Sequence, residues 1–330
     1  MLGKFPVKAV LAVDGGASKV DVVLADVEGH VLSAIRRRGQ FNFGLGSNGS
    51  FEGLARAIHA ATHGDVASLG VFCLAGADLP LDDRRILAEV ALQRWASHTI
   101  VRNDTFAVLR AGTDRTWGVA VVCGTGMNCA GVGPDGKSVR FPSFGELSGD
   151  KAHGGGWLGR SALGAAIRAR DGRGPRTELE RLVPEHFGMS RPTAVMEAVY
   201  LGRLDYSRMS ELAPLVMKAA TRGDVVARAM LDEMVEEIVV TANAAIKRLR
   251  LADTDVHVVL GGGVLRGAQK DVLDRIRAGI QQVAPRAKTL PLEAPPVLGA
   301  ALIGLDELRA PRTAQGRLRS TLTERRFGPS

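Results

Sequence analysis

Two short glycine-rich segments have the residue types that bind phosphate. Residues 14–21 read DGGASKVD and residues 124–126 read GTG, and each follows an apolar run typical of a buried strand. Glycine lacks a Cβ atom, so successive backbone N–H groups of such a turn can approach phosphate oxygens closely. In the first segment the Ser18 hydroxyl and the Lys19 ammonium add donors, and the Asp14 carboxylate is a hard oxygen ligand suited to Mg²⁺. These features predict two phosphate loops, although a plain hairpin explains the first segment equally well.

A third glycine-rich segment follows a predicted strand near the end of the chain. Residues 258–267 read VVLGGGVLRG, which places Gly261, Gly262 and Gly263 between a strand and a helix. The segment fails the dinucleotide fingerprint G-x-G-x-x-G because Arg266 occupies the last position, and no acidic residue ends a following strand. We therefore expect these glycines to let the backbone approach an adenosine.

A fourth segment, residues 131–138, matches the P-loop pattern G-x-x-x-x-G-K-[ST]. A P-loop requires a helix directly after its last residue. Here Ser138 is followed by the strand-favouring residues VRF and by Pro142, which stops a helix. The PDG at residues 134–136 is also strong turn chemistry between two strand-like runs. We predict a β-hairpin here and no nucleotide site.

Strands and helices must position these loops, and their predicted order is typical of a layered α/β protein. The first ~112 residues predict the order βββαβαβα, and residues 116–136 then repeat the opening unit of strand, glycine turn and strand. This echo indicates two related domains that face each other across a cleft. We expect an N-terminal domain over 1–115, a C-terminal domain over 116–296, a helix over 297–309 that can pack back on the first domain, and a basic, disordered tail over 310–330.

The composition of the 330-residue chain is that of an ordinary enzyme with a basic end. Residues 309–330 hold six Arg and one Glu, so this end carries +5 of the formal net charge of +8. Without interleaved aromatic residues it favours a frayed, solvated terminus over a nucleic-acid-binding arm. No apolar run reaches the roughly 18 residues of a membrane span, and no signal peptide opens the chain. The cysteines, Cys73, Cys123 and Cys129, form no disulfide or C-x-x-C framework, so we expect a cytoplasmic protein.

The three glycine loops, in this order, resemble those of the actin-like ATPase superfamily, which includes sugar kinases, Hsp70 and actin. Residues 147–179, LSGDKAHGGGWLGRSALGAAIRARDGRGPRTEL, resemble the long signature of the BadF/BadG/BcrA/BcrD ATPase family, to which N-acetylglucosamine kinases belong. The resemblance extends from Val10 to about Leu305 and leaves only the basic tail outside. It implies a two-domain, ribonuclease H-like α/β fold with an interdomain cleft, and ATP with Mg²⁺ as cofactors.

The resemblance also implies roles for individual residues. Asp104, in the segment VRNDTFAVL, is the expected general base, although this segment has the pattern of a helix N-cap too. The expected phosphate and adenosine contacts are Gly15, Gly16, Ser18, Lys19, Gly124, Thr125, Gly126, Gly261, Gly262 and Gly263, with Asp14 at the metal. The expected sugar contacts are Asn42, Gly76, Asp104, Asn128, Gly145 and Asp150.

Together these roles predict an ATP-dependent kinase that phosphorylates N-acetylglucosamine at its 6-hydroxyl. Glucosamine is the alternative acceptor, and a reductase-activating ATPase is the alternative activity within the family. Lys151 stands where many relatives have an acidic or aromatic residue, which affects either the sugar contacts or a nearby cation site. Asp21 and Asp78 are interpreted as surface or structural residues. We expect small-molecule partners and no nucleic acid or membrane, and the sequence leaves a homodimer open.

Overall fold

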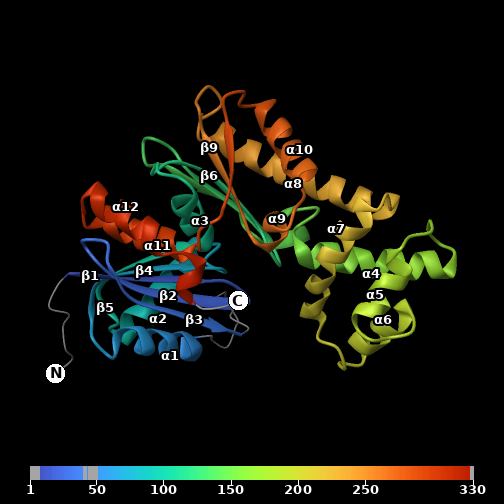
Figure 1. Cartoon of the computed structure of the whole chain (residues 1–330), viewed down its shortest axis with the longest axis horizontal. Helices are drawn as coiled ribbons and strands as arrows, with labels where there is room; N and C mark the ends of the chain where they lie inside the picture. The colour runs from blue at the N-terminus through green and yellow to red at the C-terminus, as the bar shows by residue number, and fades with distance from the viewer. Residues whose placement is uncertain (1–7, 40–42, 44–50, 328–330) are drawn as a thin grey trace.

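The computed structural model describes residues 8–39, 43 and 51–327, and within them two five-stranded mixed sheets form two lobes (Figure 1). The first sheet has the strand order β3-β2-β1-β4-β5, and the second has the order β10-β9-β6-β7-β8. In each sheet an antiparallel hairpin lies beside parallel strands, since β1 pairs with β2 and β4 just as β6 pairs with β7 and β9. The repeated unit of strand, glycine turn and strand is therefore the centre of both sheets.

The first lobe contains most of the elements that precede residue 113. Its strands are β1 (Ala9–Gly15), β2 (Lys19–Asp26), β3 (Val31–Arg38), β4 (Ala67–Leu74) and β5 (Ala96–Asn103). Its helices are α1 (Phe51–Thr62), α2 (Pro80–Gln93) and α3 (Asp104–Gly112). One apolar cluster joins the sheet to α1 and α2, and a second joins its other face to α3 and α11 (Val297–Glu307). The chain thus returns to the first lobe with its last long apolar helix.

The second lobe combines its sheet with a larger set of helices. The strands are β6 (Gly118–Cys123), β7 (Met127–Val132), β8 (Ser138–Arg140), β9 (His257–Gly261) and β10 (Lys288–Pro291). The helices are α4 (Gly155–Asp171), α5 (Leu179–His186), α6 (Pro192–Tyr200), α7 (Ala213–Thr221), α8 (Val225–Arg248), α9 (Gly263–Arg266) and α10 (Lys270–Gln281), with 3₁₀ turns at η1 (Gly145–Ser148) and η2 (Tyr206–Leu212). A single large apolar cluster holds most of these elements together.

Helix α3 is packed between the two sheets. A Cβ atom at Gly112 would lie 2.3 Å from a Val259 methyl of β9, and one at Gly261 would lie 2.7 Å from a Val108 methyl of α3. Helix α11 approaches equally closely from the other side, because a Cβ atom at Gly299 would lie 1.8 Å from the Ala107 carbonyl oxygen. The helix that begins at Asp104 is therefore held by close backbone approach on several sides.

The segment that resembled a P-loop is the β7–β8 hairpin, as predicted. The Gly133 N–H donates to the Lys137 carbonyl oxygen at 2.8 Å, and Gly136 has a φ of +80°, which a glycine adopts without strain. Ser138 is the first residue of β8. No helix follows it directly, so the backbone donors of a P-loop are missing here.

The disordered tail expected over 310–330 is wrong for the residues that the structure describes. Residues Arg312–Thr321 form helix α12, which buries Ala314 and Leu318 against the first lobe, and Glu324–Phe327 form the 3₁₀ turn η3. The Arg319 guanidinium donates to the carbonyl oxygens of Ala111 and Arg110 at 2.7 and 2.9 Å. Arginine side chains that appeared solvated in the sequence thus bind carbonyl oxygens at the end of α3.

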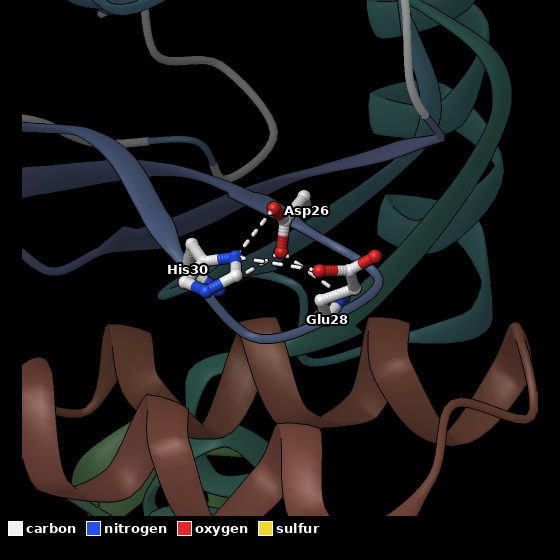
Figure 2. Close-up of side chains that lie close together, drawn as sticks. All are labelled: Asp26, Glu28 and His30. Atoms are coloured by element: carbon white, nitrogen blue, oxygen red, sulfur yellow. Dashed lines mark hydrogen bonds and ion pairs between the residues drawn. The ribbon is translucent and has the colours of Figure 1, made fainter.

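The turn between β2 and β3 receives another arginine of α12. Figure 2 shows Asp26, Glu28 and His30 close together in this turn, and His30 Nδ1 lies 2.9 Å from an Asp26 carboxylate oxygen. The Arg317 guanidinium donates to His30 Nε2 at 2.8 Å and to the Glu28 carbonyl oxygen at 2.9 Å. Asp26, Glu28 and His30 have the residue types of a metal site, but the Arg317 guanidinium already binds the His30 imidazole. The cluster therefore anchors helix α12 to the first lobe.

None of the described helices is both long and apolar enough to cross a bilayer.

Candidate active site

Both predicted phosphate loops line one cavity of about 430 Å³ between the lobes. The first loop joins β1 to β2, the second joins β6 to β7, and the third glycine segment reaches the same cavity from the end of β9. The predicted residues that line the cavity are Asp14, Gly16, Ser18, Lys19, Gly76, Asp104, Gly124, Thr125, Gly126, Asn128, Gly262 and Gly263. The fold thus brings together segments that lie more than a hundred residues apart in the sequence.

The glycines of the first loop have different roles. A Cβ atom at Gly15 would lie 2.6 Å from Leu74 and 2.8 Å from the Phe43 ring, so this glycine allows close packing beneath the loop. A Cβ atom at Gly16 would meet only the Lys19 carbonyl oxygen, at an unstrained 3.9 Å, and the Gly16 N–H closes the turn by donating to the same oxygen at 3.0 Å. Ser18 is exposed and lines the cavity. The first loop is therefore a hairpin turn that also lines the cavity.

The Lys19 ammonium is partly neutralised before any ligand is present. Its Nζ atom lies 2.8 Å from Asp21 Oδ2, and the Arg36 guanidinium binds the same carboxylate with Nε at 2.6 Å from Oδ1. The Asp21 side chain is fully buried. A buried carboxylate needs such partners, so Arg36 keeps Asp21 compensated if Lys19 turns toward a phosphate.

The second loop rests on the start of helix α4. The Gly155 and Gly156 N–H groups donate to the carbonyl oxygens of Gly124 and Thr125, each at 2.8 Å. A Cβ atom at Gly154 would lie 2.5 Å from the backbone of Gly126, and Gly154 has a φ of +100°. The glycines after His153 in the signature segment thus allow α4 to support the loop from below.

The three glycines of the third loop are needed for different reasons. Gly261 packs against Val108, and Gly262 has a φ of +95° that brings its Cα close to the backbone of Cys123. Gly261 does not line the cavity, whereas Gly262 and Gly263 do. Only Gly263 has open space around it. In this segment Gly261 and Gly262 allow close packing, and only Gly263 has room for a larger side chain.

A second cavity of about 670 Å³ adjoins the first and shares Ser18, Gly124, Thr125 and Gly263 with it. Residues of η2, of α7 and of the segment after α9 form its remaining wall: Ser210, Ala213, Pro214, Met217, Lys218, Thr221, Arg222, Gly267 and Gln269, with Gly155 and Val264. The sequence analysis missed this wall because only helical periodicity marks α7. Its mixed apolar and polar character is suited to a nucleoside.

Asp104 faces the cleft from the first turn of α3. Asn103, and not Asp104, is the N-cap of this helix, since the Asn103 side-chain oxygen accepts from the Thr105 N–H at 3.0 Å. The Asp104 side chain is half-buried and lines the cavity. Burial, and next the charge of Asp78, raise the pKa of Asp104 to about 7. Its carboxyl group can therefore exchange a proton near neutral pH.

Asp14, at the end of β1, is the candidate metal ligand. Its carboxyl group is buried, and burial together with the charges of Asp21 and Asp104 raises its pKa well above the usual value, against the opposing effect of Lys19 and Arg36. A divalent cation at the cavity side would favour the ionised form of this carboxylate. The oxygen donors and the excess of negative charge in the cluster fit Mg²⁺.

The predicted sugar contacts are only partly brought together. Gly76, with a φ of +86°, and Asn128 of β7 line the cavity beside Asp104. Gly145 and Asp150 lie in and after η1, where the Asp150 N–H donates to the Gly145 carbonyl oxygen at 3.1 Å, and neither lines the cavity in this structure. Asn42 lies outside the described residues. Of the predicted sugar contacts, Gly76, Asp104 and Asn128 share the cavity.

Asp78 lies in this cavity, so its interpretation as a surface or structural residue was incomplete. Its side chain is buried, lines the cavity and accepts hydrogen bonds from Asn103 and Asn128. Burial is the main cause that raises the pKa of Asp78, while its hydrogen bond from Asn128 opposes this. Its sequence neighbours gave no signal, since both partners come from distant strands.

Known proteins resemble the chain over most of its length. The model of the BadF/BadG/BcrA/BcrD ATPase family matches residues 11–304. The chain is 25% identical over 309 residues to an N-acetylmuramic acid/N-acetylglucosamine kinase of Clostridium acetobutylicum, covering 91% of this chain and 99% of that protein. It is also 25% identical over 315 residues to an N-acetyl-D-glucosamine kinase of Dictyostelium discoideum, covering 90% and 97%.

A solved structure has the same fold. A Chromobacterium violaceum protein assigned as an N-acetylglucosamine kinase superposes with a TM-score of 0.70 at 26% identity, covering 90% of this chain and 99% of that one. The predicted actin-like α/β fold is thereby confirmed. The basic tail lies beyond the matched family residues, as the sequence analysis expected.

Proposed function

Because the chain belongs to the BadF/BadG/BcrA/BcrD ATPase family, we propose that it is an ATP-dependent kinase that phosphorylates the 6-hydroxyl of N-acetylglucosamine. One observation carries the proposal. Asp104, a carboxylate with a raised pKa, faces the same cavity as two glycine hairpins from opposite lobes. This arrangement suits transfer of a phosphoryl group to an alcohol, which requires a nucleotide, an acceptor and a proton acceptor in one place.

The two adjoining cavities support a division between nucleotide and acceptor. The larger one is wide enough for adenosine, and the phosphates would extend through the shared residues toward the smaller one. The hydroxyl groups of Ser18 and Thr125 and the exposed backbone of Gly126 offer neutral donors along this path. Lys19 would leave Asp21 for the phosphates, while Arg36 continues to compensate that carboxylate. Bound Mg²⁺ would supply charge relief on the phosphates beside Asp14.

Asp104 would accept the proton of the sugar hydroxyl during the attack on the γ-phosphate. A base with a pKa near the working pH combines a large ionised fraction with a useful proton affinity. Asn128 and the backbone at Gly76 are within the same cavity and would orient the sugar by hydrogen bonds. A buried polar group left unpaired by the wrong sugar would discriminate against it.

A reductase-activating ATPase is less well supported. That activity depends on an iron–sulfur cluster shared between subunits, which needs accessible thiolates. Cys123 and Cys129 are buried within β6 and β7, and burial raises the pKa of Cys123 to about 12. The described cysteines thus behave as small core residues.

The proposal is tested by measuring ADP release with a panel of acceptors. The panel contains N-acetylglucosamine, glucosamine, N-acetylmuramic acid, glucose and no sugar, and phosphorus NMR of the product locates the modified hydroxyl. We expect N-acetylglucosamine to give the highest kcat/KM and a 6-phosphate. Equal ADP release with and without sugar would contradict the proposal, as would preference for a plain hexose. The matched variant Asp104→Asn should retain ATP binding and lose sugar-dependent turnover.

A further inference from the structure

Asp78 joins the two lobes at the bottom of the proposed acceptor site. Its Oδ1 atom accepts one hydrogen bond from Asn103 Nδ2 and another from Asn128 Nδ2, each at 2.9 Å. Asn103 ends β5 of the first sheet, whereas Asn128 belongs to β7 of the second. Asp78 follows the end of β4. One carboxylate oxygen thus ties three strand ends from both lobes together.

A carboxylate fixes the direction of these two amides. An ionised carboxylate can only accept hydrogen bonds, so each asparagine must turn its NH₂ group toward Asp78. The amide oxygens then point elsewhere, and each finds a donor. Asn103 Oδ1 accepts from the Thr105 N–H at 3.0 Å, and Asn128 Oδ1 accepts from the Cys129 N–H at 2.7 Å.

Holding both amides has consequences for the proposed acceptor site. The Asn103 side chain caps helix α3 and so fixes the position of Asp104, the first residue of that helix. The Asn128 amide lines the cavity with its NH₂ group held by Asp78 through one hydrogen, which leaves the other hydrogen to donate. Asn128 would therefore present a donor of defined direction to a sugar oxygen.

Asp78 is not placed as an ordinary structural ion pair. The nearby Arg140 guanidinium binds Asp83 and the Ala77 carbonyl oxygen, and the hydrogen bonds found for Asp78 come from neutral amides. Burying a carboxylate against neutral groups costs stability that a neutral side chain would not. A residue that only connects the lobes does not require the negative charge of a carboxylate. Fixing the direction of the two asparagine amides does require a group that only accepts hydrogen bonds.

We propose that Asp78 is a positioning residue for the sugar acceptor, acting through the direction that it imposes on the Asn128 amide. This proposal rests on the proposed kinase function. Asp78 does not line the proposed nucleotide cavity of about 670 Å³, and the hydrogen bonds found for it come from Asn103 and Asn128. Its effect should therefore fall on the acceptor and leave ATP unaffected.

The test compares Asp78→Ala with Asp78→Asn in the full-length protein. The acceptor is the sugar that the wild-type protein phosphorylates best, and KM for sugar, KM for ATP, kcat and the melting temperature are measured. Loss of one oriented hydrogen bond predicts a KM for sugar raised about tenfold in Asp78→Ala, with KM for ATP unchanged. Asp78→Asn keeps one carbonyl acceptor in the same place, so it should recover part of the sugar affinity.

Asp82→Ala is the matched control. Asp82 is a buried aspartate in the first turn of α2, four residues after Asp78, and its carboxylate accepts from the Leu79 N–H at 2.9 Å. Its removal should lower the melting temperature without changing KM for sugar, as expected for a structural residue. If Asp78→Ala behaves like Asp82→Ala, or raises KM for ATP as much as KM for sugar, the proposal is wrong.

Failure of this proposal is distinct from failure of the proposed function. A wild-type protein that phosphorylates no sugar overturns the kinase assignment and with it the role of Asp78. A wild-type kinase whose KM for sugar is the same in Asp78→Asn and Asp78→Ala as in the unchanged protein overturns the role of Asp78 alone. If Asp78→Ala does not fold, the KM for sugar of Asp78→Asn decides the question.

Discussion

The raised pKa of Asp104 predicts the pH dependence of the proposed reaction. A general base acts only when it is ionised, and burial together with the Asp78 charge raises the pKa of Asp104 to about 7. With that pKa about one tenth of the molecules are ionised at pH 6 and about nine tenths at pH 8. We therefore expect kcat/KM for the sugar to rise about tenfold between these two pH values. With the usual pKa of an aspartate, the same range would be flat.

The assay is kcat/KM for the sugar from pH 5.5 to 8.5, with MgATP saturating and Mg²⁺ in excess. Direct detection of the phosphorylated sugar avoids coupling enzymes that have pH profiles of their own. Asp14 also has a raised pKa and lies in the same cavity, so a second titration must be separated from that of Asp104. The groups whose charges act on Asp14 are Asp21, Lys19, Asp104 and Arg36.

Asp78→Asn makes the separation, because the Asp78 charge is a main cause of the raised pKa of Asp104 and is not among the main causes of the raised pKa of Asp14. Removing this negative charge lowers the pKa of Asp104, so the acidic limb of the profile should move to lower pH. The reasoning is refuted if kcat/KM is flat from pH 6 to 8. It is equally refuted if the limb stays at the same pH in Asp78→Asn.

Three further substitutions have defined expected outcomes. Asp104→Asn should lower kcat by about 10²–10⁴-fold. It should also raise the melting temperature at pH 8. The pKa of Asp104 is raised from 3.8 to about 7 in the folded protein, so ionisation of this carboxyl group lowers the free energy of unfolding as the pH rises through this range, and asparagine removes that loss. Lys19→Gln should raise KM for ATP with KM for sugar unchanged, which initial rates at varied ATP measure. Leu318→Ala, in the buried face of α12, should lower the free energy of unfolding by about 2–5 kcal/mol in a urea titration, whereas a disordered tail would give no change.

Glycine turns and strand runs are local signals, so the sequence predicts them well. The hairpins at residues 14–21 and 121–128, the hairpin that resembles a P-loop, and the strand before Asp104 all lie where the sequence analysis expects them. Each follows from residues within ten positions of one another: an apolar run, a glycine or proline, and a second run. The roles of individual glycines are less local, since Gly15 and Gly261 serve packing against Leu74 and Val108.

The missed features depend on contacts between distant segments. Asp78 acts on Asn103 and Asn128, which are 25 and 50 residues away, and no spacing rule connects the three. The wall of the larger cavity comes from α7, a helix whose sequence shows only ordinary amphipathic spacing. Propensity and pattern describe a segment and its neighbours, whereas a site is made by tertiary packing.

The basic tail illustrates the same limit through its charges. An arginine-rich segment predicts a solvated terminus only if the folded protein offers no hydrogen-bond acceptors to its guanidinium groups. Here the first lobe offers such acceptors. Arg319 binds carbonyl oxygens at the end of α3, and Arg110 of that helix binds Asp306 of α11 at 2.7 Å. The tail therefore satisfies the carboxyl end of the helix whose first residue is Asp104, where cations are favoured by the helix dipole.

The last turn of the tail contacts the ion pairs of Asp21 in β2. Glu324 accepts from the Arg36 guanidinium at 2.8 Å, and the Phe327 ring lies over the same guanidinium at 4.4 Å to its centroid. Arg36 in turn holds Asp21, the carboxylate that binds Lys19. Because each step is a direct contact between charged or aromatic groups, the tail supports both the helix of the proposed base and the strand that presents the phosphate-loop lysine. Within this basic end the Arg317, Arg319 and Arg326 guanidinium groups all donate to acceptors of the first lobe, so part of its positive charge serves internal contacts.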